Sequence, residues 1–156
     1  HVKEANESGT KYKGKDIFDS PMVKLARFGE YPKGEGGLIM SKYMRIAVNS
    51  AMKALKDETL SPQDIKEFEE SNTFSVVVNV SSESVQTPED VQIILIQGTN
   101  TILPQKTEFG MKYKDKRQGV VGTFPYAKIN PKANTTIIVK TREYQKKYTI
   151  DFSDVK

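Results

Sequence analysis

The sequence predicts an α+β protein in which N-terminal helices pack on an antiparallel β-sandwich of about seven strands. Helical patterns come first along the chain and strand patterns follow, whereas a parallel βαβ sheet requires the two to alternate. Between Thr73 and Ser81, apolar residues alternate with Ser75 and Asn79, which is typical of a strand with one buried face. Short apolar segments separated by turn residues then continue to the C-terminus.

A chain of 156 residues is long enough to bury one core, so we expect one folded unit with an appendage. Residues 1–16 are polar and rich in Lys and Gly, and we expect a flexible tether there. The rest divides into a helical segment over residues 17–72 and the β-sandwich over residues 73–156.

The helical segment contains three predicted helices. Ser20 is the expected N-cap of a short helix that ends at Gly29, with Pro21 in its first position. Residues 31–37 are rich in Gly and Pro and predict a loop. Leu38 to Lys56 has apolar residues at spacings of three and four, and we expect this helix to pack on the downstream sheet. Ser61 and Pro62 begin the third helix.

The strands are expected at residues 73–81, 91–97, 101–103, 107–113, 120–126, 135–141 and 148–152. Residues 91–97 are almost continuously apolar, which is typical of a central strand covered on both sides. This number and spacing of strands favours an immunoglobulin-like sandwich, although the sequence has neither the Cys pair nor the Trp of true immunoglobulin domains. An antiparallel barrel is the alternative fold.

The composition disfavours many kinds of catalysis and predicts a protein that is not an enzyme. There is no Cys, and the only His is His1, so we expect no catalytic triad, no thiolate nucleophile, no metal site and no cofactor. Paired carboxylates for carbohydrate cleavage remain an alternative. The 33–37 loop lacks the glycine spacing and the Gly-Lys-Ser/Thr ending of phosphate-binding loops, which predicts a simple connector.

Charge is distributed unevenly along the chain. Residues 57–90 contain nine acidic residues and one basic residue, whereas residues 106–147 contain eleven basic residues and three acidic ones. The acidic and the basic segment could attract charged partners, pair with each other or simply be solvated.

The basic turn between two predicted strands is the candidate binding surface. It combines one aromatic residue with four cations, namely Lys112, Tyr113, Lys114, Lys116 and Arg117. Basic groups beside an aromatic ring suit an anionic polymer or single-stranded nucleic acid. A solvated hairpin tip is the alternative, because such tips are usually charged.

The layout of a polar tail, some helix and a Lys-rich, Cys-free sandwich resembles small exported bacterial envelope proteins and lipoproteins. The resemblance is one of style, covers roughly residues 73–156 and transfers no functional residue. It implies a binding or assembly module outside the cytoplasm, in the periplasm or at the cell surface, with a lipid anchor upstream as one means of attachment. The expected partner is an envelope protein or an anionic polymer. A cloned internal segment is the alternative explanation for a sequence that begins without Met.

Overall fold

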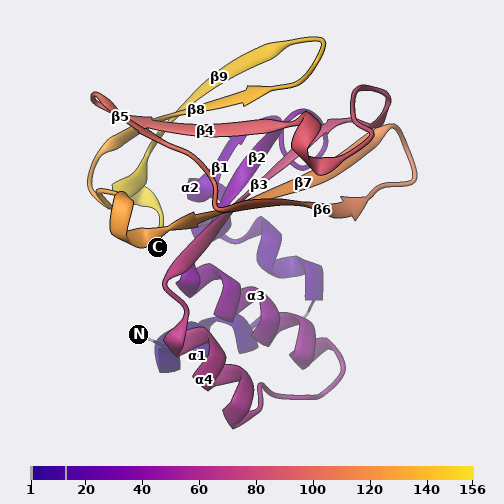
Figure 1. Cartoon of the computed structure of the whole chain (residues 1–156). Coiled ribbons are helices and arrows are strands. Elements are labelled where there is room, and N and C mark those ends of the chain that lie inside the picture. Colours follow the sequence, from indigo (N-terminus) through magenta and orange to yellow (C-terminus); the bar gives the residue numbers. More distant parts are fainter. Residues whose placement is uncertain (1, 13) are drawn as a thin grey trace.

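The computed structural model describes residues 2–12 and 14–156, and it consists of two antiparallel sheets beside a group of helices. Sheet A has the strand order β1-β2-β3-β7-β6, and sheet B has the order β5-β4-β8-β9. Figure 1 shows the two sheets stacked, with α1, α3 and α4 grouped together beneath them. The sheets are not closed into a barrel. The predicted α+β class with antiparallel sheets is therefore confirmed.

Nine strands are present among the described residues. They are β1 (Arg27–Gly29), β2 (Gly36–Met40), β3 (Thr73–Ser81), β4 (Gln92–Gln97), β5 (Asn100–Ile102), β6 (Lys106–Lys112), β7 (Arg117–Pro125), β8 (Asn134–Lys140) and β9 (Gln145–Asp151). The last seven occupy the seven segments in which strands were predicted, and β3 has the predicted bounds.

The helices of the described chain are α1 (Val2–Thr10), α2 (Pro21–Ala26), α3 (Lys42–Leu55) and α4 (Pro62–Glu70). Short 3-10 helices are η1 (Gly14–Asp19), η2 (Ser82–Ser84), η3 (Pro88–Asp90), η4 (Tyr126–Lys128) and η5 (Phe152–Asp154). Ser20 and Ser61 cap α2 and α4 as predicted, and Asp64 completes a capping box with Ser61.

Two strands lie where the sequence predicted none. The predicted short helix ends at Ala26 instead of Gly29, because Arg27 to Gly29 form β1, and β2 replaces the end of the predicted loop and the start of the predicted long helix. Gly36 to Met40 forms β2, which pairs with β1 on one side and with β3 on the other. The predicted helix therefore begins later, at Lys42, where the hydroxyl oxygen of Ser41 accepts a hydrogen bond from Met44 N. The apolar residues Leu38 and Ile39 fit either structure, and pairing with β3 decides between them.

The predicted tether contains a helix. Residues 2–10 form α1, in which Ala5 and Gly9 are buried. Their spacing of four puts two small residues on one helix face, and this face allows close packing against α3. His1 and Lys13, which the tether prediction includes, lie outside the described residues.

Helix α3 packs mainly against α1 and η1 rather than across a sheet face, which differs from the prediction. Its buried Met44, Ala47 and Ala51 join the main core, whereas Tyr43 and Ile46 belong to a second cluster with Ala5 and Leu60. It contacts the sandwich near its first turn, where Lys42 N donates to the Tyr126 hydroxyl at 2.7 Å.

The main core lies between the two sheets. Phe74, Val76, Val78 and Val80 of β3 point into it, together with buried residues of β4, β7 and β8. Strand β4 is covered on one side only, contrary to expectation, because Ile93 and Leu95 are fully buried while Ile94 and Ile96 are half-buried. The strand therefore contributes one face to the core and one to the surface.

The acidic and basic halves of the chain pair with each other at two points. Lys116 Nζ lies 3.0 Å from Glu83 Oε1, and Arg142 Nη2 lies 3.0 Å from Asp90 Oδ1. These two ion pairs support the alternative that the acidic and basic segments pair with each other. In the part of the chain that the structure describes, no helix has both the length and the apolar character needed to cross a membrane.

Candidate functional site

Two pockets of about 350 Å³ each lie at sheet A, one on its outer face and one at the end of the sheet where the β1–β2 loop meets the β6–β7 hairpin. The first, here called the aromatic pocket, is walled by four separate parts of the chain. Its lining combines apolar, aromatic and charged side chains: Phe18, Asp19, Val23 and Arg27 from η1, α2 and β1, Tyr31 and Pro32 from the β1–β2 loop, Val77 and Asn79 from β3, and Met111, Tyr113 and Gly119 from the β6–β7 hairpin. The second, here called the loop pocket, is lined by Lys33, Glu35, Asn79, Asp115, Lys116 and Arg117 among others. Asn79 lines both.

Asn79 stands between two glycines on neighbouring strands, since its register partners are Gly36 of β2 and Gly119 of β7. A Cβ atom on Gly36 would lie 2.2 Å from Phe28 O, and one on Gly119 would lie 2.9 Å from Met111 O. Both positions therefore require glycine for close backbone approach. Asn79 therefore has no side chain directly opposite it on either adjacent strand.

The side chain of Asn79 is held in one orientation. Its Nδ2 donates to Pro32 O at 3.1 Å and to the Tyr113 hydroxyl at 3.3 Å. The residue is only 2% exposed, and its Oδ1 has no hydrogen-bond partner among the described residues. A buried acceptor without a donor is uncommon in folded proteins and needs an explanation.

The carbonyl of Pro32 ties the β1–β2 loop to the β6–β7 hairpin. It accepts a hydrogen bond from Arg117 Nη1 as well as from Asn79. The Arg117 guanidinium lies 4.0 Å from the centre of the Tyr113 ring and pairs with Asp115 at 2.9 Å. Hydrogen bonds from Arg117 hold the pKa of Asp115 below its usual value. These contacts fix the two segments that separate the pockets.

Tyr31 and Tyr113 are the two tyrosines that line the aromatic pocket. Burial, followed by the nearby Tyr113 phenol, raises the pKa of Tyr31 to about 12. The nearby Arg27 opposes this rise in the pKa, but the Tyr31 phenol is neutral at physiological pH.

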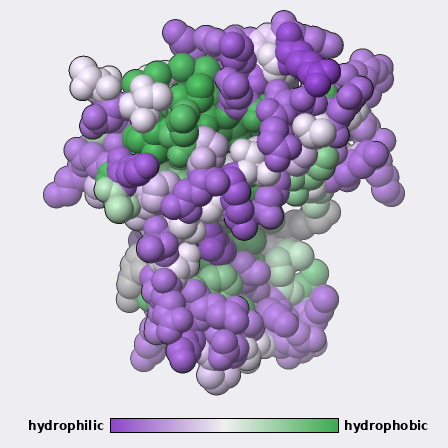
Figure 2. Space-filling model, in the orientation of Figure 1, coloured by the Kyte–Doolittle hydropathy of each residue, from purple (hydrophilic) through white to green (hydrophobic). Residues whose placement is uncertain are grey.

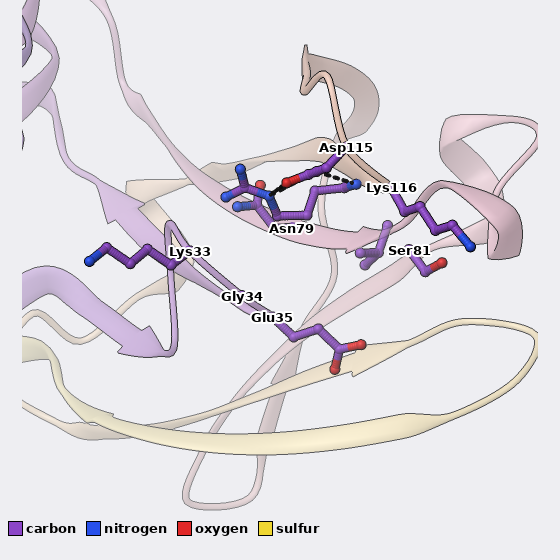
Figure 3. Close-up of a pocket in the computed structure, with 9 residues that line it drawn as sticks. Lys33, Gly34, Glu35, Asn79, Ser81, Asp115 and Lys116 are labelled. Atoms are coloured by element: carbon purple, nitrogen blue, oxygen red, sulfur yellow. Dashed lines mark hydrogen bonds and ion pairs between the residues drawn. The ribbon is translucent and has the colours of Figure 1, made fainter.

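The charged groups of the loop pocket do not converge. Figure 3 shows the side chains of Lys33 and Lys116 pointing in opposite directions, away from each other. Lys116 pairs with Glu83, Arg117 pairs with Asp115, and Glu35 pairs with Lys146. No group of three or more His, Cys, Asp or Glu side chains suited to a metal ion occurs among residues 2–12 and 14–156.

The structure separates the five residues predicted as a binding surface. Tyr113 lines the aromatic pocket, and Lys116 and Arg117 line the loop pocket. Lys112 and Lys114 are exposed and line neither pocket. Whether these residues bind a partner stays a prediction.

Sequence reasoning missed Asn79, Tyr31, Phe18 and Met111 as residues of a shared site. One signal was available for Asn79, because an amide interrupts the valine-rich run of β3 between Val78 and Val80. The others come from segments that only folding brings together. Asp90, one of the acidic residues of the 57–90 segment, has a carboxylate that accepts hydrogen bonds from Gln86 N and Thr87 N at the start of η3, which is a structural role.

A second surface feature lies on sheet B. Ile94 and Ile96 of β4 and Ile138 of β8 are half-buried on its outer face, where Figure 2 shows hydrophobic surface over these strands.

No protein-family model, no curated protein and no solved structure matches the chain.

Proposed function

We propose that this protein is a non-catalytic binding module whose ligand site is the aromatic pocket on the outer face of sheet A. The observation that supports it most is Asn79, a buried amide with an unpaired acceptor at a pocket of about 350 Å³. Pockets of about this size or larger, mostly apolar with a few placed polar groups, are typical of small-molecule sites.

Carbohydrate cleavage fits the geometry less well. The loop pocket is lined by two carboxylates, Glu35 and Asp115, but each is paired with a cation. The pKa of Asp115 is lowered, whereas the general acid of a glycosidase needs a raised pKa. These two features favour binding over catalysis.

Recognition of an anionic polymer or of nucleic acid is also less favoured. Arg117 and Lys116 already pair with carboxylates, and Lys33 points away from Lys116 (Figure 3). A site for a phosphate chain would present its cations along one shared surface. The aromatic pocket is therefore preferred over the basic hairpin tip as the binding site.

The location outside the cytoplasm and the immunoglobulin-like nature of the sandwich belong to the same proposal. Two packed antiparallel sheets are a scaffold that many cell-surface domains use for recognition. Reading the residues upstream of His1 and fractionating cells would test the location. A signal sequence with protein in the envelope fraction supports it, and a purely cytosolic protein contradicts it.

The binding site itself can be tested with a matched pair of valines. Val77 and Val121 are register partners on the outer face of sheet A, but only Val77 lines the aromatic pocket. A panel of small ring compounds is screened by NMR. We expect the largest changes in amide chemical shift on adding a compound at Asn79, Tyr113 and Gly119. Val77→Phe fills the pocket and should weaken binding at least tenfold, whereas Val121→Phe should leave it nearly unchanged. Shifts elsewhere on the surface, or equal binding by both variants, would contradict the proposal.

A further inference from the structure

We infer that the aromatic pocket takes a small aromatic carboxylate and that the Arg27 guanidinium binds its carboxylate group. The inference rests on the proposed function and adds the charge and the chemical class of the ligand. It is carried by the position of Arg27 in sheet A and by the lack of a counter-ion for its charge among the described residues.

The register of sheet A places Arg27 on the face that bears the pocket. Arg27 of β1 is opposite Leu38 of β2, and Leu38 is opposite Val77 of β3. Residues directly opposite each other on paired strands point to the same face of a sheet. Val77 and Arg27 both line the aromatic pocket. The Arg27 side chain therefore leaves the sheet on the same side as the pocket and forms part of its wall.

The charge of Arg27 has no counter-ion in the part of the chain that the structure describes. Its guanidinium takes part in none of the ion pairs there, whereas Arg117 and Arg142 pair with Asp115 and Asp90. Arg27 is also half-buried, and a half-buried cation gains more from an anion than an exposed one, because water screens the pair less. A ligand carboxylate would supply this partner and can accept two parallel hydrogen bonds from a guanidinium.

Two phenols in the same wall favour an acceptor as the ligand's polar group. Arg27 opposes the rise in the pKa of Tyr31, which places its charge near this phenol. A hydrogen bond with Tyr113 helps to raise the same pKa, so Tyr31 is the donor in it, and Asn79 Nδ2 also donates to the Tyr113 hydroxyl at 3.3 Å. Tyr113 keeps its own hydrogen for an acceptor. A carboxylate can only accept hydrogen bonds, so it suits a wall that contains a guanidinium and phenol groups.

Asp19 also lines the pocket and makes a cationic ligand the alternative. Its side chain is exposed, so water already stabilises its charge, and an ion pair at such a position contributes little. Asp19 precedes α2 and Arg27 follows it, which puts the six residues of this helix, roughly 9 Å in length, between them. A carboxylate held by Arg27 is therefore not forced against Asp19.

The other walls of the pocket suit an aromatic ring. Flat rings pack well against aromatic faces and against the thioether of methionine. With about 350 Å³, the pocket is at the small end of ligand sites, which suits a single ring with a short acidic side chain. The apolar and aromatic side chains available to the ring are Phe18, Val23, Tyr31, Val77, Met111 and Tyr113.

The test uses three probes of similar shape and different charge at pH 7, namely phenylacetate, phenylacetamide and 2-phenylethylamine. Each is titrated into the full chain, and the dissociation constant is obtained from amide NMR shifts. We expect phenylacetate to bind about tenfold more tightly than phenylacetamide, because a hydrogen-bonded charge pair replaces a neutral contact. Arg27→Gln should remove this preference. Lys24→Gln is the matched control, since it removes an exposed cation from α2 that does not line the pocket, and it should keep the preference.

Each result has a distinct meaning. A preference for phenylacetate that Arg27→Gln removes and Lys24→Gln keeps supports the inference. If Arg27→Gln does not fold, a crystal structure of the wild-type complex decides, and a carboxylate beyond hydrogen-bond distance of Arg27 overturns the inference. A preference that survives Arg27→Gln also overturns it.

Two further results overturn the inference but leave the aromatic pocket as a binding site. These are equal affinity for phenylacetate and phenylacetamide, and tightest binding of 2-phenylethylamine, which would assign the charge recognition to Asp19 instead. Failure of all three probes to bind overturns the inference as well. The wider compound panel with the Val77 and Val121 variants then judges the proposed function separately.

Discussion

At the scale of single residues, the site depends on polar groups that a strand pattern does not distinguish. Asn79 occupies a position where the alternation of β3 predicts an outward polar residue, yet it is only 2% exposed because the β1–β2 loop and the β6–β7 hairpin cover it. Tyr31 comes from a segment that reads as a connector and is half-buried beside Tyr113. Burial changes the chemistry of both side chains.

The high pKa of Tyr31 predicts a pH dependence. Its folded pKa is about 12, above the ordinary value of 10.0, so the unfolded chain loses this proton first as pH rises. The stability that Tyr31 contributes is complete below about pH 10 and is lost between about pH 10 and pH 12. Burial also raises the pKa of Tyr144 to about 12, so absorbance of tyrosinate near 295 nm is expected to show late-titrating phenols in the native protein, and Tyr31→Phe should reduce that late change in absorbance by the amount of one phenol.

Tyr113→Phe is the companion variant. It keeps Tyr31 but removes the neighbouring phenol that helps raise its pKa, so Tyr31 should titrate earlier, though still late because burial is the larger cause. Titration of all seven tyrosines together near pH 10 would show that Tyr31 is not buried as described.

At the scale of elements, local pattern and tertiary pairing disagree in two places. The stretch containing β2 has residues that suit either a helix or a strand, and β1 and β3 supply the hydrogen bonds that make it a strand. The polar N-terminal stretch has too few apolar residues to predict a packed helix, but α1 needs only Ala5 and Gly9 to approach α3 closely. Small residues allow contact without a large apolar stripe.

The close contact between α1 and α3 predicts that Gly9→Ala lowers the stability of the protein, although helix propensity alone would predict an increase. A Cβ atom on Gly9 would lie 2.0 Å from Ala47 O. Gly9→Ala should therefore destabilise the protein by about 1–3 kcal/mol in urea unfolding, although Ala in an exposed helix would stabilise by about 1 kcal/mol. Glu7→Ala, at an exposed position of the same helix, should change stability by less than about 0.5 kcal/mol. A stabilising Gly9→Ala would mean that α1 does not pack on α3.

At the scale of the whole molecule, one aromatic cluster connects the parts of the sandwich. Phe74 of β3 lies 5.7 Å from the ring of Phe124, 5.0 Å from Tyr126 and 5.5 Å from Phe152. These rings come from β3, β7, η4 and η5. Tyr126 also accepts a hydrogen bond from Lys42 N, which links the same cluster to the first turn of α3.

This cluster predicts a large loss of stability when its central ring is removed. Phe74→Ala should cost about 3–5 kcal/mol, because the ring is fully buried and its neighbours cannot collapse onto the space. Phe109→Ala is the matched control, since this side chain is 45% exposed, and it should cost less than about 1 kcal/mol. Thermal or urea unfolding of both variants measures the difference. Similar costs for the two would contradict the described core.

The part of the fold that could be predicted is the part that local pattern encodes. Alternation and turn residues placed all seven predicted strands, and the Ser20 and Ser61 caps marked two helix starts, because strand faces and helix ends depend on near neighbours. One residue of the aromatic pocket, Tyr113, was within reach for the same reason. Tyr113 and Arg117 were selected from one hairpin, where residues close in sequence are also close in space.

The rest depended on contacts between residues far apart in the chain. The residues of β2 do not by themselves indicate that β3 lies beside this strand. Likewise, the residues of α1 do not indicate that Ala47 of α3 leaves room only for a glycine at position 9. Asn79 is separated from Pro32 by 47 positions and from Tyr113 by 34, so only folding brings their polar groups together. The α+β class follows from the sequence alone. The pocket and the burial of Asn79 in its wall follow from packing, because burial and hydrogen-bond partners are properties of the assembled sheets and loops.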